Sequence, residues 1–176
     1  MNITVLGAGA GGTTVAFDCA AHGHQVRLFD FPQFADNIAA IAEQGGIHAE
    51  GDIAGFNAVA YAGHDVDRAL ENAELVYVVG PAFSTEPFGQ AVAGKLMPGQ
   101  TVIVTPGSCG GALAFKRAAG LPVDAALTSA RAFLFARGHE VDVLAGGGNK
   151  ITLATHEKYV RTQKRSEFVK GLGQHG

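Results

Sequence analysis

The chain has 176 residues, of which 47% are hydrophobic and 16% are charged, and 25 are glycines. This length suits one domain with a short appendage, and the hydrophobic content is too high for a disordered chain. The formal net charge of −3 argues against a nucleic-acid partner. No apolar run approaches the roughly 18 residues of a membrane span, and no signal peptide is visible, so we expect a cytoplasmic protein with no membrane partner.

The first 30 residues contain a pattern of strand, glycine turn, helix and strand. Asn2–Leu6 is a short apolar run that predicts a buried strand, and residues 7–12 (GAGAGG) predict a tight turn. Residues 13–22 have the composition of a helix, and Gln25–Phe29 is a second apolar run that ends at Asp30. Together they predict one βαβ unit.

The middle of the chain continues the alternation of strands and helices. Because helices separate its strands, the expected fold is α/β, a Rossmann-type doubly wound, mainly parallel sheet. The expected elements are a helix over 36–44, a β-hairpin over 47–61, a helix over 66–72 capped by Asp65, a strand over 75–79, a helix over 86–96, a strand over 101–105, a helix over 110–119 and a weaker strand over 123–129.

The last third differs in character. Apolar residues at 133–135 and 141–144 flank a polar link, and a turn at 146–149 precedes the apolar run 151–153, which predicts an antiparallel hairpin added to the sheet edge. We therefore expect a dinucleotide-binding domain over 1–155. Residues 156–176 form a basic tail. We interpret this tail either as a solvated helix face or as a partner-binding surface.

The glycine turn is the strongest functional signal. The spacing Gly7-x-Gly9-x-x-Gly12 follows a strand and opens a helix, as dinucleotide binding requires. The first glycine permits the sharp turn, the second lets a pyrophosphate approach the backbone, and the third lets the helix pack close to the strand. The alternative is a glycine-rich turn without a ligand. The predicted cofactor-binding run comprises Gly7, Ala8, Gly9, Ala10, Gly11 and Gly12.

Asp30 stands at the end of the second strand, 18 residues after Gly12. A carboxylate there accepts hydrogen bonds from the adenosine ribose hydroxyls and repels a 2′-phosphate. Arg27, the nearest cation, has an odd offset from Asp30 along the strand and so lies on the opposite face. The alternative for Asp30 is a turn or helix-cap aspartate. The sequence favours NAD over NADP.

Two further loops leave the carboxyl ends of predicted strands, where a doubly wound sheet binds its ligand. Pro81, Ala82 and Phe83 follow one strand, and Pro106 and Gly107 follow another, so we expect them to line the cofactor. The alternative is that proline and glycine merely end each strand.

The titratable residues give no catalytic or metal-binding pattern. Cys109 has no histidine partner that the sequence places beside it, and the seven histidines show no metal-ligand spacing, so no metal is expected. The sequence assigns no catalytic residue.

Three motifs stand together in this chain: the glycine turn with Asp30, VVGPAF at 78–83 with Glu86, and TPGSCGGALAF at 105–115. Through these motifs, residues 2–155 resemble the nucleotide-binding domain of the octopine and nopaline (opine) dehydrogenases. The resemblance implies an NAD(P)-dependent oxidoreductase that reduces the imine formed between an amino acid and a 2-oxo acid. Two positions depart from the family: Thr85 stands where members have histidine, and residues 127–131 differ from the usual stretch.

Members of that family also have a second, all-helical domain that supplies the catalytic histidine and aspartate, and we expect that domain to be absent here. One reading is therefore an oxidoreductase reduced to its cofactor domain, and the other is a stand-alone NAD-binding sensor or regulatory module without turnover. A structural protein with a decayed nucleotide site is disfavoured because the glycines and Asp30 are intact. We also expect a homo-oligomer, since apolar surface that the second domain covers in relatives would be exposed.

Overall fold

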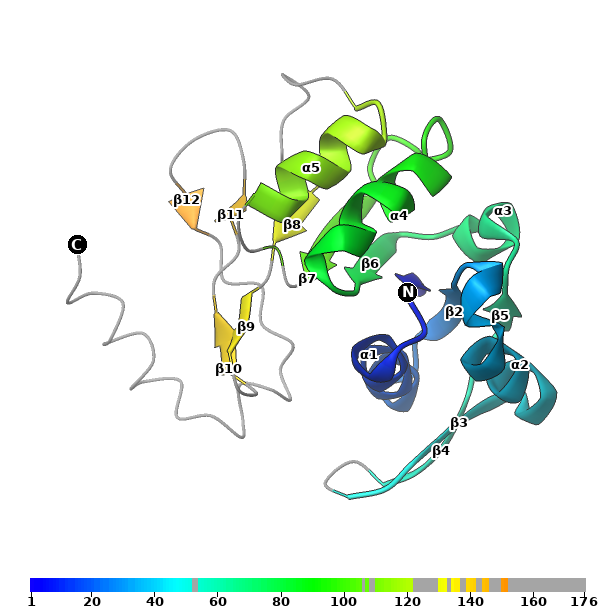
Figure 1. The fold of residues 1–176 in the computed structure, drawn as a ribbon. Coiled ribbons are helices and arrows are strands. Elements are labelled where there is room, and N and C mark those ends of the chain that lie inside the picture. The colour runs from blue at the N-terminus through cyan, green and yellow to red at the C-terminus, as the bar shows by residue number, and fades with distance from the viewer. Residues whose placement is uncertain are drawn as a thin grey trace.

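Six parallel strands form the central sheet of the computed structural model, in the order β5-β2-β1-β6-β7-β8 (Figure 1). The structure describes residues 1–51, 54–105, 107 and 110–121, together with the backbone of short strands between 130 and 151. The strand order reverses between β1 and β6, which is the arrangement of a doubly wound fold. The strands are β1 (Asn2–Leu6), β2 (Gln25–Phe29), β5 (Tyr61–Gly63), β6 (Leu75–Val79), β7 (Thr101–Thr105) and β8 (Ala130–Ala132).

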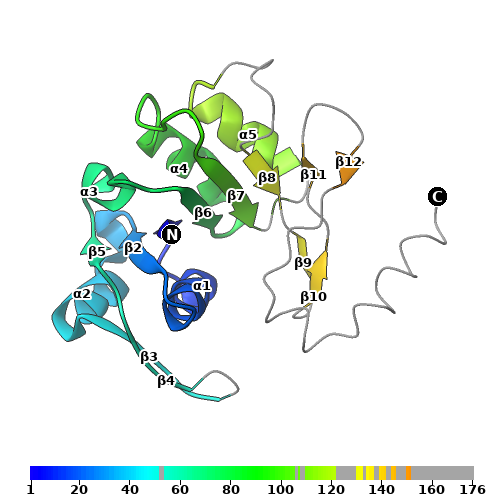
Figure 2. The same ribbon diagram turned by 180° about the vertical axis from the view of Figure 1, so that it is seen from behind.

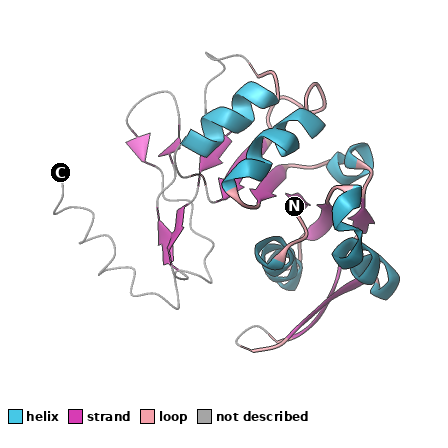
Figure 3. Cartoon of the chain, in the orientation of Figure 1, coloured by secondary structure: helices cyan, strands magenta, loops and turns pink. Residues whose placement is uncertain are grey.

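Helices cover both faces of the sheet (Figure 3). Side chains alternate between the two faces of a strand, and β1 shows the division: Ile3 and Val5 pack with α1 and α2, while Leu6 belongs to the cluster formed with α3, α4 and α5. The expected α/β doubly wound fold is confirmed. The helices are α1 (Ala10–Ala21), α2 (Ala35–Gln44), α3 (Val66–Leu70), α4 (Thr85–Ala91) and α5 (Gly111–Ala118), with short 3-10 turns η1 (Pro32–Phe34) and η2 (Ala82–Ser84). No helix in the described part of the chain is long and apolar enough to cross a membrane.

An antiparallel hairpin, β3 (Gly46–Ala49) and β4 (Gly55–Ala58), projects from the body of the fold between α2 and β5 (Figures 1 and 2). The hairpin was expected over 47–61, but Tyr61 belongs instead to β5, which pairs in parallel with β2. The sequence did not show β5 as a separate strand because three half-buried residues are too short to give a periodic pattern.

Other element boundaries also differ from expectation. α1 begins at Ala10, so the last three residues of the glycine run are helical. α4 ends at Ala91, five residues before the expected end. β8 stands beside β7, whereas residues 123–129, where a strand was expected, lie outside the described residues.

Antiparallel pairing follows β8, as expected, but in two separate pairs. β9 (Leu134–Ala136) pairs with β10 (His139–Val141), and β11 (Leu144–Ala145) pairs with β12 (Lys150–Ile151). Each pair is a two-stranded sheet of its own rather than an extension of the central sheet. The tail over 156–176 and the turn over 146–149 lie outside the described residues.

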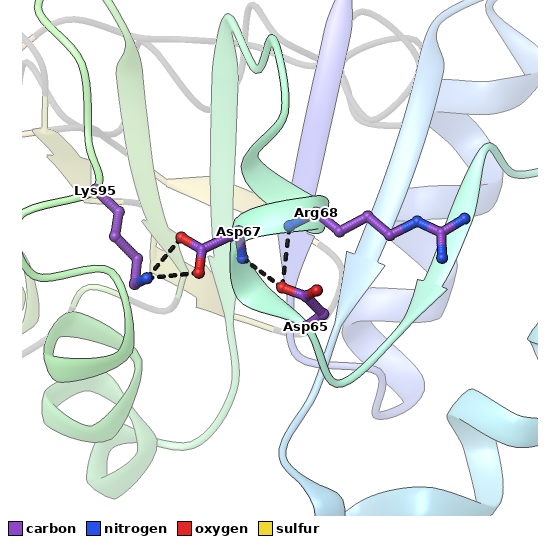
Figure 4. Close-up of polar contacts among 4 residues, drawn as sticks. All are labelled: Asp65, Asp67, Arg68 and Lys95. Carbon is purple, nitrogen blue, oxygen red and sulfur yellow. Dashed lines mark hydrogen bonds and ion pairs between the residues drawn. The ribbon is translucent and has the colours of Figure 1, made fainter.

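The expected cap of α3 is present (Figure 4). The Asp65 carboxylate accepts hydrogen bonds from the backbone N–H groups of Asp67 (3.0 Å) and Arg68 (3.2 Å). Asp67 in turn forms an ion pair with Lys95, which follows α4, at an Nζ–Oδ2 distance of 2.7 Å. Because this pair is largely exposed, it contributes little to stability, and the cap is the stronger of the two contributions.

Candidate cofactor-binding site

The glycine turn lies at the carboxyl end of β1, where the strand order reverses toward β6. Gly7 adopts φ +110°, a conformation that residues with a side chain rarely reach. A Cβ atom at Gly7 would lie 2.0 Å from the carbonyl oxygen of Val79, the last residue of β6. Gly7 is therefore required by the fold, because it lets the turn pass directly against the neighbouring strand.

The other two glycines of the motif have opposite surroundings. A Cβ atom at Gly12 would lie 1.7 Å from the Gly7 carbonyl oxygen, so this glycine too is required for packing of α1 on the turn. Apart from the chain neighbours of Gly9, no atom of the described residues lies within 4 Å of the corresponding position. The backbone of Gly9 has φ −71° and ψ −177°, which any residue can adopt. Neither packing nor backbone conformation in the described structure requires glycine at position 9.

The amino end of α1 is open to an anion. Gly9 is its N-cap, no side chain caps the helix, and no acidic residue stands in its first turn. The N–H of Gly9 has no acceptor among the residues that the structure describes. Free N–H groups and the positive end of the helix dipole attract phosphate.

Asp30 follows β2 and is buried, with 7% of its surface exposed. One carboxylate oxygen, Oδ2, accepts a hydrogen bond from the Ala8 N–H at 2.7 Å, and Oδ1 accepts one from the Phe31 N–H at 2.8 Å. A carboxylate has lone pairs for about four hydrogen bonds, so acceptor capacity for a ribose hydroxyl remains. Asp30 therefore supports the glycine turn directly, a role that the sequence did not reveal.

Two polar side chains near Asp30 were not anticipated. His64, just after β5, lies with Nδ1 at 2.7 Å from the Asp30 carbonyl oxygen, to which that nitrogen donates. Asn37 of α2 donates from Nδ2 to the Ala8 carbonyl oxygen at 3.1 Å. Neither residue belongs to a recognisable motif, and their positions depend on how α2 and β5 pack beside β2.

A cleft of about 490 Å³ adjoins the glycine turn on the side of α2 and the β3–β4 hairpin. Its described lining consists of small and apolar residues, the hydroxyl of Thr13, two amide side chains and the imidazole of His48. The residues are Ala8, Gly9, Ala10, Thr13, Asn37, Ala40, Ile41, Gln44, Gly46, Ile47 and His48.

Three aromatic rings pack beneath the other side of the turn. Phe31 stacks on Phe88 of α4 with ring centroids 5.1 Å apart, and Phe29 meets both rings edge to face. Phe88 also lies 3.4 Å from the Cβ position of Gly7. This cluster joins the end of β2 to α4 and gives the turn an apolar support.

The two remaining predicted loops are only partly described. Pro81, Ala82 and Phe83 follow β6 and are exposed, Phe83 to 80%. Gly107 is buried after β7 and its carbonyl accepts the Gly111 N–H at 3.3 Å, whereas Pro106 and Cys109 lie outside the described residues. Within the described part of the chain, no three His, Cys, Asp or Glu residues are grouped to hold a metal.

A parallel doubly wound sheet, a glycine turn after β1 and an aspartate directly after β2 together define the class of NAD-binding Rossmann-type domains. Residues 2–114 match the family described as NAD-dependent glycerol-3-phosphate dehydrogenase N-terminus, and the chain belongs to that family. NAD is the cofactor that this assignment supports, in agreement with the sequence prediction.

A curated relative agrees with the predicted resemblance. An opine dehydrogenase from Arthrobacter sp. (strain 1C) is 33% identical over 114 residues, which cover 64% of this chain and 31% of that protein. The chain thus spans about a third of the length of this relative.

Solved structures share the fold. Octopine dehydrogenase, in complex with NADH and agmatine, gives a TM-score of 0.60 at 21% identity, over 76% of this chain and 34% of that one. D-mandelate dehydrogenase with NADH gives 0.58 at 18% identity, over 76% and 38% of the two chains. The chain is an NAD-binding oxidoreductase domain similar to those of opine dehydrogenases and related enzymes.

Proposed function

We propose that this chain binds NAD at the open end of α1 and serves as the nucleotide-binding part of an oxidoreductase that reduces imines formed between amino acids and 2-oxo acids. The pyrophosphate lies over Gly9 and the first N–H groups of α1, and the adenosine ribose lies beside Asp30. Pro81, Ala82, Phe83, Pro106 and Gly107 line the nicotinamide half.

The observation that carries the proposal is the empty space around Gly9. A Cβ atom on Gly7 or Gly12 would meet backbone atoms, but a Cβ atom on Gly9 would meet no atom of the described residues within 4 Å beyond its chain neighbours. A pyrophosphate approaching the backbone gives a reason for glycine at position 9 that protein packing does not.

Support for the substrate class comes from relatives. The Arthrobacter protein is an opine dehydrogenase. Octopine dehydrogenase has been solved with NADH and L-arginine and with NADH and pyruvate, an amino acid and a 2-oxo acid. The same two kinds of substrate, with NADH, are therefore the first to assay with this chain.

A second candidate function is an NAD-binding sensor or regulatory module without turnover. The loop after β6, residues 80–84, favours this second function because it contains no side chain that titrates near neutral pH. Hydride transfer to an imine needs an acid near the developing amine, and general acid–base catalysis contributes a large part of such a rate.

Titration of NADH fluorescence, followed by NADPH and ADP-ribose, tests cofactor binding. We expect NADH to bind more tightly than NADPH. Gly9→Ala should weaken NADH binding at least tenfold while the melting temperature stays within a few degrees, because the added methyl group meets only the ligand. Equal NADH affinity of Gly9→Ala and the unchanged chain would contradict placement of the pyrophosphate at Gly9.

Steady-state NADH oxidation with a panel of 2-oxo acids, with and without amino acids, separates the two functions. Turnover above about 1 s⁻¹, the low end for ordinary enzymes, would establish an imine reductase carried by this chain itself. We expect cofactor binding with turnover below that rate, since no catalytic acid is identified among the described residues.

A further inference from the structure

We infer that Asn37 is a positioning residue that sets the direction of the Gly9 N–H toward the pyrophosphate. This inference rests on the proposed function for its ligand, but its structural part stands on two hydrogen bonds. Asp30 Oδ2 accepts from the Ala8 N–H at 2.7 Å, and Asn37 Nδ2 donates to the Ala8 carbonyl oxygen at 3.1 Å.

These two bonds hold two successive peptide groups. The Ala8 N–H belongs to the peptide between Gly7 and Ala8, and the Ala8 carbonyl belongs to the peptide between Ala8 and Gly9. Asp30 and Asn37 therefore fix the planes on both sides of Ala8, from the end of β2 and from α2 respectively. The Asp30 contact does not reach the second peptide, whose carbonyl oxygen is the one that Asn37 holds.

The geometry of a trans peptide gives the consequence for Gly9. In such a group the C=O and the following N–H point in opposite directions within one plane. By drawing the Ala8 carbonyl toward α2, Asn37 turns the Gly9 N–H away from α2. That N–H has no acceptor among the described residues, so its direction is held for a ligand rather than by a partner of its own.

Asn37 suits a specific test because it is exposed on α2 and its side chain makes a single hydrogen bond among the described residues. Asn37→Leu removes the donor at nearly constant shape, and leucine is a better helix former than asparagine. A loss of binding in this variant is therefore not expected to arise from unfolding of α2. Asn37→Asp places a carboxylate oxygen against the carbonyl, and Asn37→Gln retains an amide donor on a longer arm.

Asn57→Leu is the matched control. Asn57 also donates from Nδ2 to a backbone carbonyl, that of Phe17 in α1, at 3.4 Å. Its removal takes away a bond of the same kind elsewhere in the fold. Comparison of the two leucine variants separates an effect on the turn from a general loss of stability.

The first measurement is the set of backbone N–H residual dipolar couplings by NMR, without ligand. In Asn37→Leu we expect the coupling of the Gly9 N–H to change, because its peptide is no longer held at the Ala8 carbonyl, while the Ala8 N–H, which Asp30 still accepts, and the Val5 N–H in β1 keep their couplings. The second is the dissociation constant for NADH and for ADP-ribose. In Asn37→Leu we expect the affinity for both ligands to fall about three- to tenfold, the equilibrium effect of losing one hydrogen bond. Asn37→Asp should lose at least as much affinity, and Asn37→Gln should recover much of it. Asn57→Leu should bind both ligands as the unchanged chain does.

The outcomes are distinguishable. An unchanged Gly9 N–H coupling in Asn37→Leu, unchanged NADH affinity, or equal losses in Asn37→Leu and Asn57→Leu would each overturn the role of Asn37. If the unchanged chain binds no NADH, the proposed function fails, and the Gly9 N–H coupling still decides whether Asn37 sets the direction of that N–H.

Discussion

Gly12 packs against the carbonyl oxygen of Gly7 so closely that a Cβ atom on Gly12 would lie 1.7 Å from that oxygen. The contact sets how near α1 comes to β1, and it involves backbone that cannot move without displacing the turn. The two glycines therefore act together in the fold, whereas Gly9 stands apart from both.

Gly12→Ala should destabilise the protein by several kcal/mol, because overpacking a backbone contact costs about 1–3 kcal/mol even where the neighbours can adjust. Urea denaturation followed by circular dichroism measures the change. Gly9→Ala is the matched control, with the same added methyl group in open space. Equal stability of the two variants would contradict the packing described for Gly12.

Asp30→Ala should weaken NADH binding and narrow the ratio of NADH to NADPH affinity. The carboxylate accepts two backbone N–H groups, so its removal should also lower the free energy of unfolding by about 1–3 kcal/mol, the usual cost of a buried donor left without a partner. Fluorescence titration with both cofactors and urea denaturation give the two quantities. Asp36→Ala, an exposed carboxylate in the first turn of α2, is the control. Tighter binding of NADPH than of NADH by the unchanged protein would refute the cofactor preference.

Cys19 should make stability fall at high pH. Burial raises the pKa of its thiol to about 12, and the neighbouring Asp18 carboxylate adds to the increase. Because the folded pKa lies above the ordinary value of 9.0, this contribution is complete below pH 9 and is lost as pH rises toward 12. The slope approaches about 1.4 kcal/mol per pH unit.

The test compares the free energy of unfolding of Cys109→Ser with that of Cys109→Ser/Cys19→Ala between pH 7 and pH 11. The alanine variant should be less stable at pH 7 because it leaves a cavity. The difference between the two proteins should narrow above pH 9, since only one of them has a buried thiol to ionise. A difference that stays constant with pH would show that the Cys19 thiol ionises as easily in the folded chain as in the unfolded one.

Self-association is expected through the face at the carboxyl ends of the strands. Phe83 after β6 and Phe34 after β2 are 80% and 54% exposed at this edge, and exposed apolar patches usually mark an interface. Analytical ultracentrifugation should show an oligomer that Phe83→Ser weakens. Met97→Ser is the control, because Met97 is 66% exposed but precedes β7 and so lies near the opposite edge. A monodisperse monomer at high concentration would exclude this interface.

The sequence by itself determined the parallel sheet, the place of the glycine turn and the acidic residue after β2. These features depend on local patterns: buried strands as continuous apolar runs, a strand followed at once by Gly7-x-Gly9-x-x-Gly12, and an aspartate at a strand end. The same locality explains why the Asp65 cap of α3 was predictable, since an N-cap bonds to residues two and three positions ahead.

Only the tertiary structure decided what the residues of the turn contact. Gly7 meets Val79, Asp30 meets Ala8, and Asn37 meets Ala8, at separations of 72, 22 and 29 residues along the chain. No local pattern encodes such contacts, because they depend on the order in which strands join the sheet and on how α2 packs beside it. The motif already gave Gly9 and Gly12 different expected roles, and only the packed fold supplies the contacts: a Cβ atom on Gly12 would meet the Gly7 carbonyl oxygen, whereas a Cβ atom on Gly9 would meet no described atom within 4 Å beyond its chain neighbours.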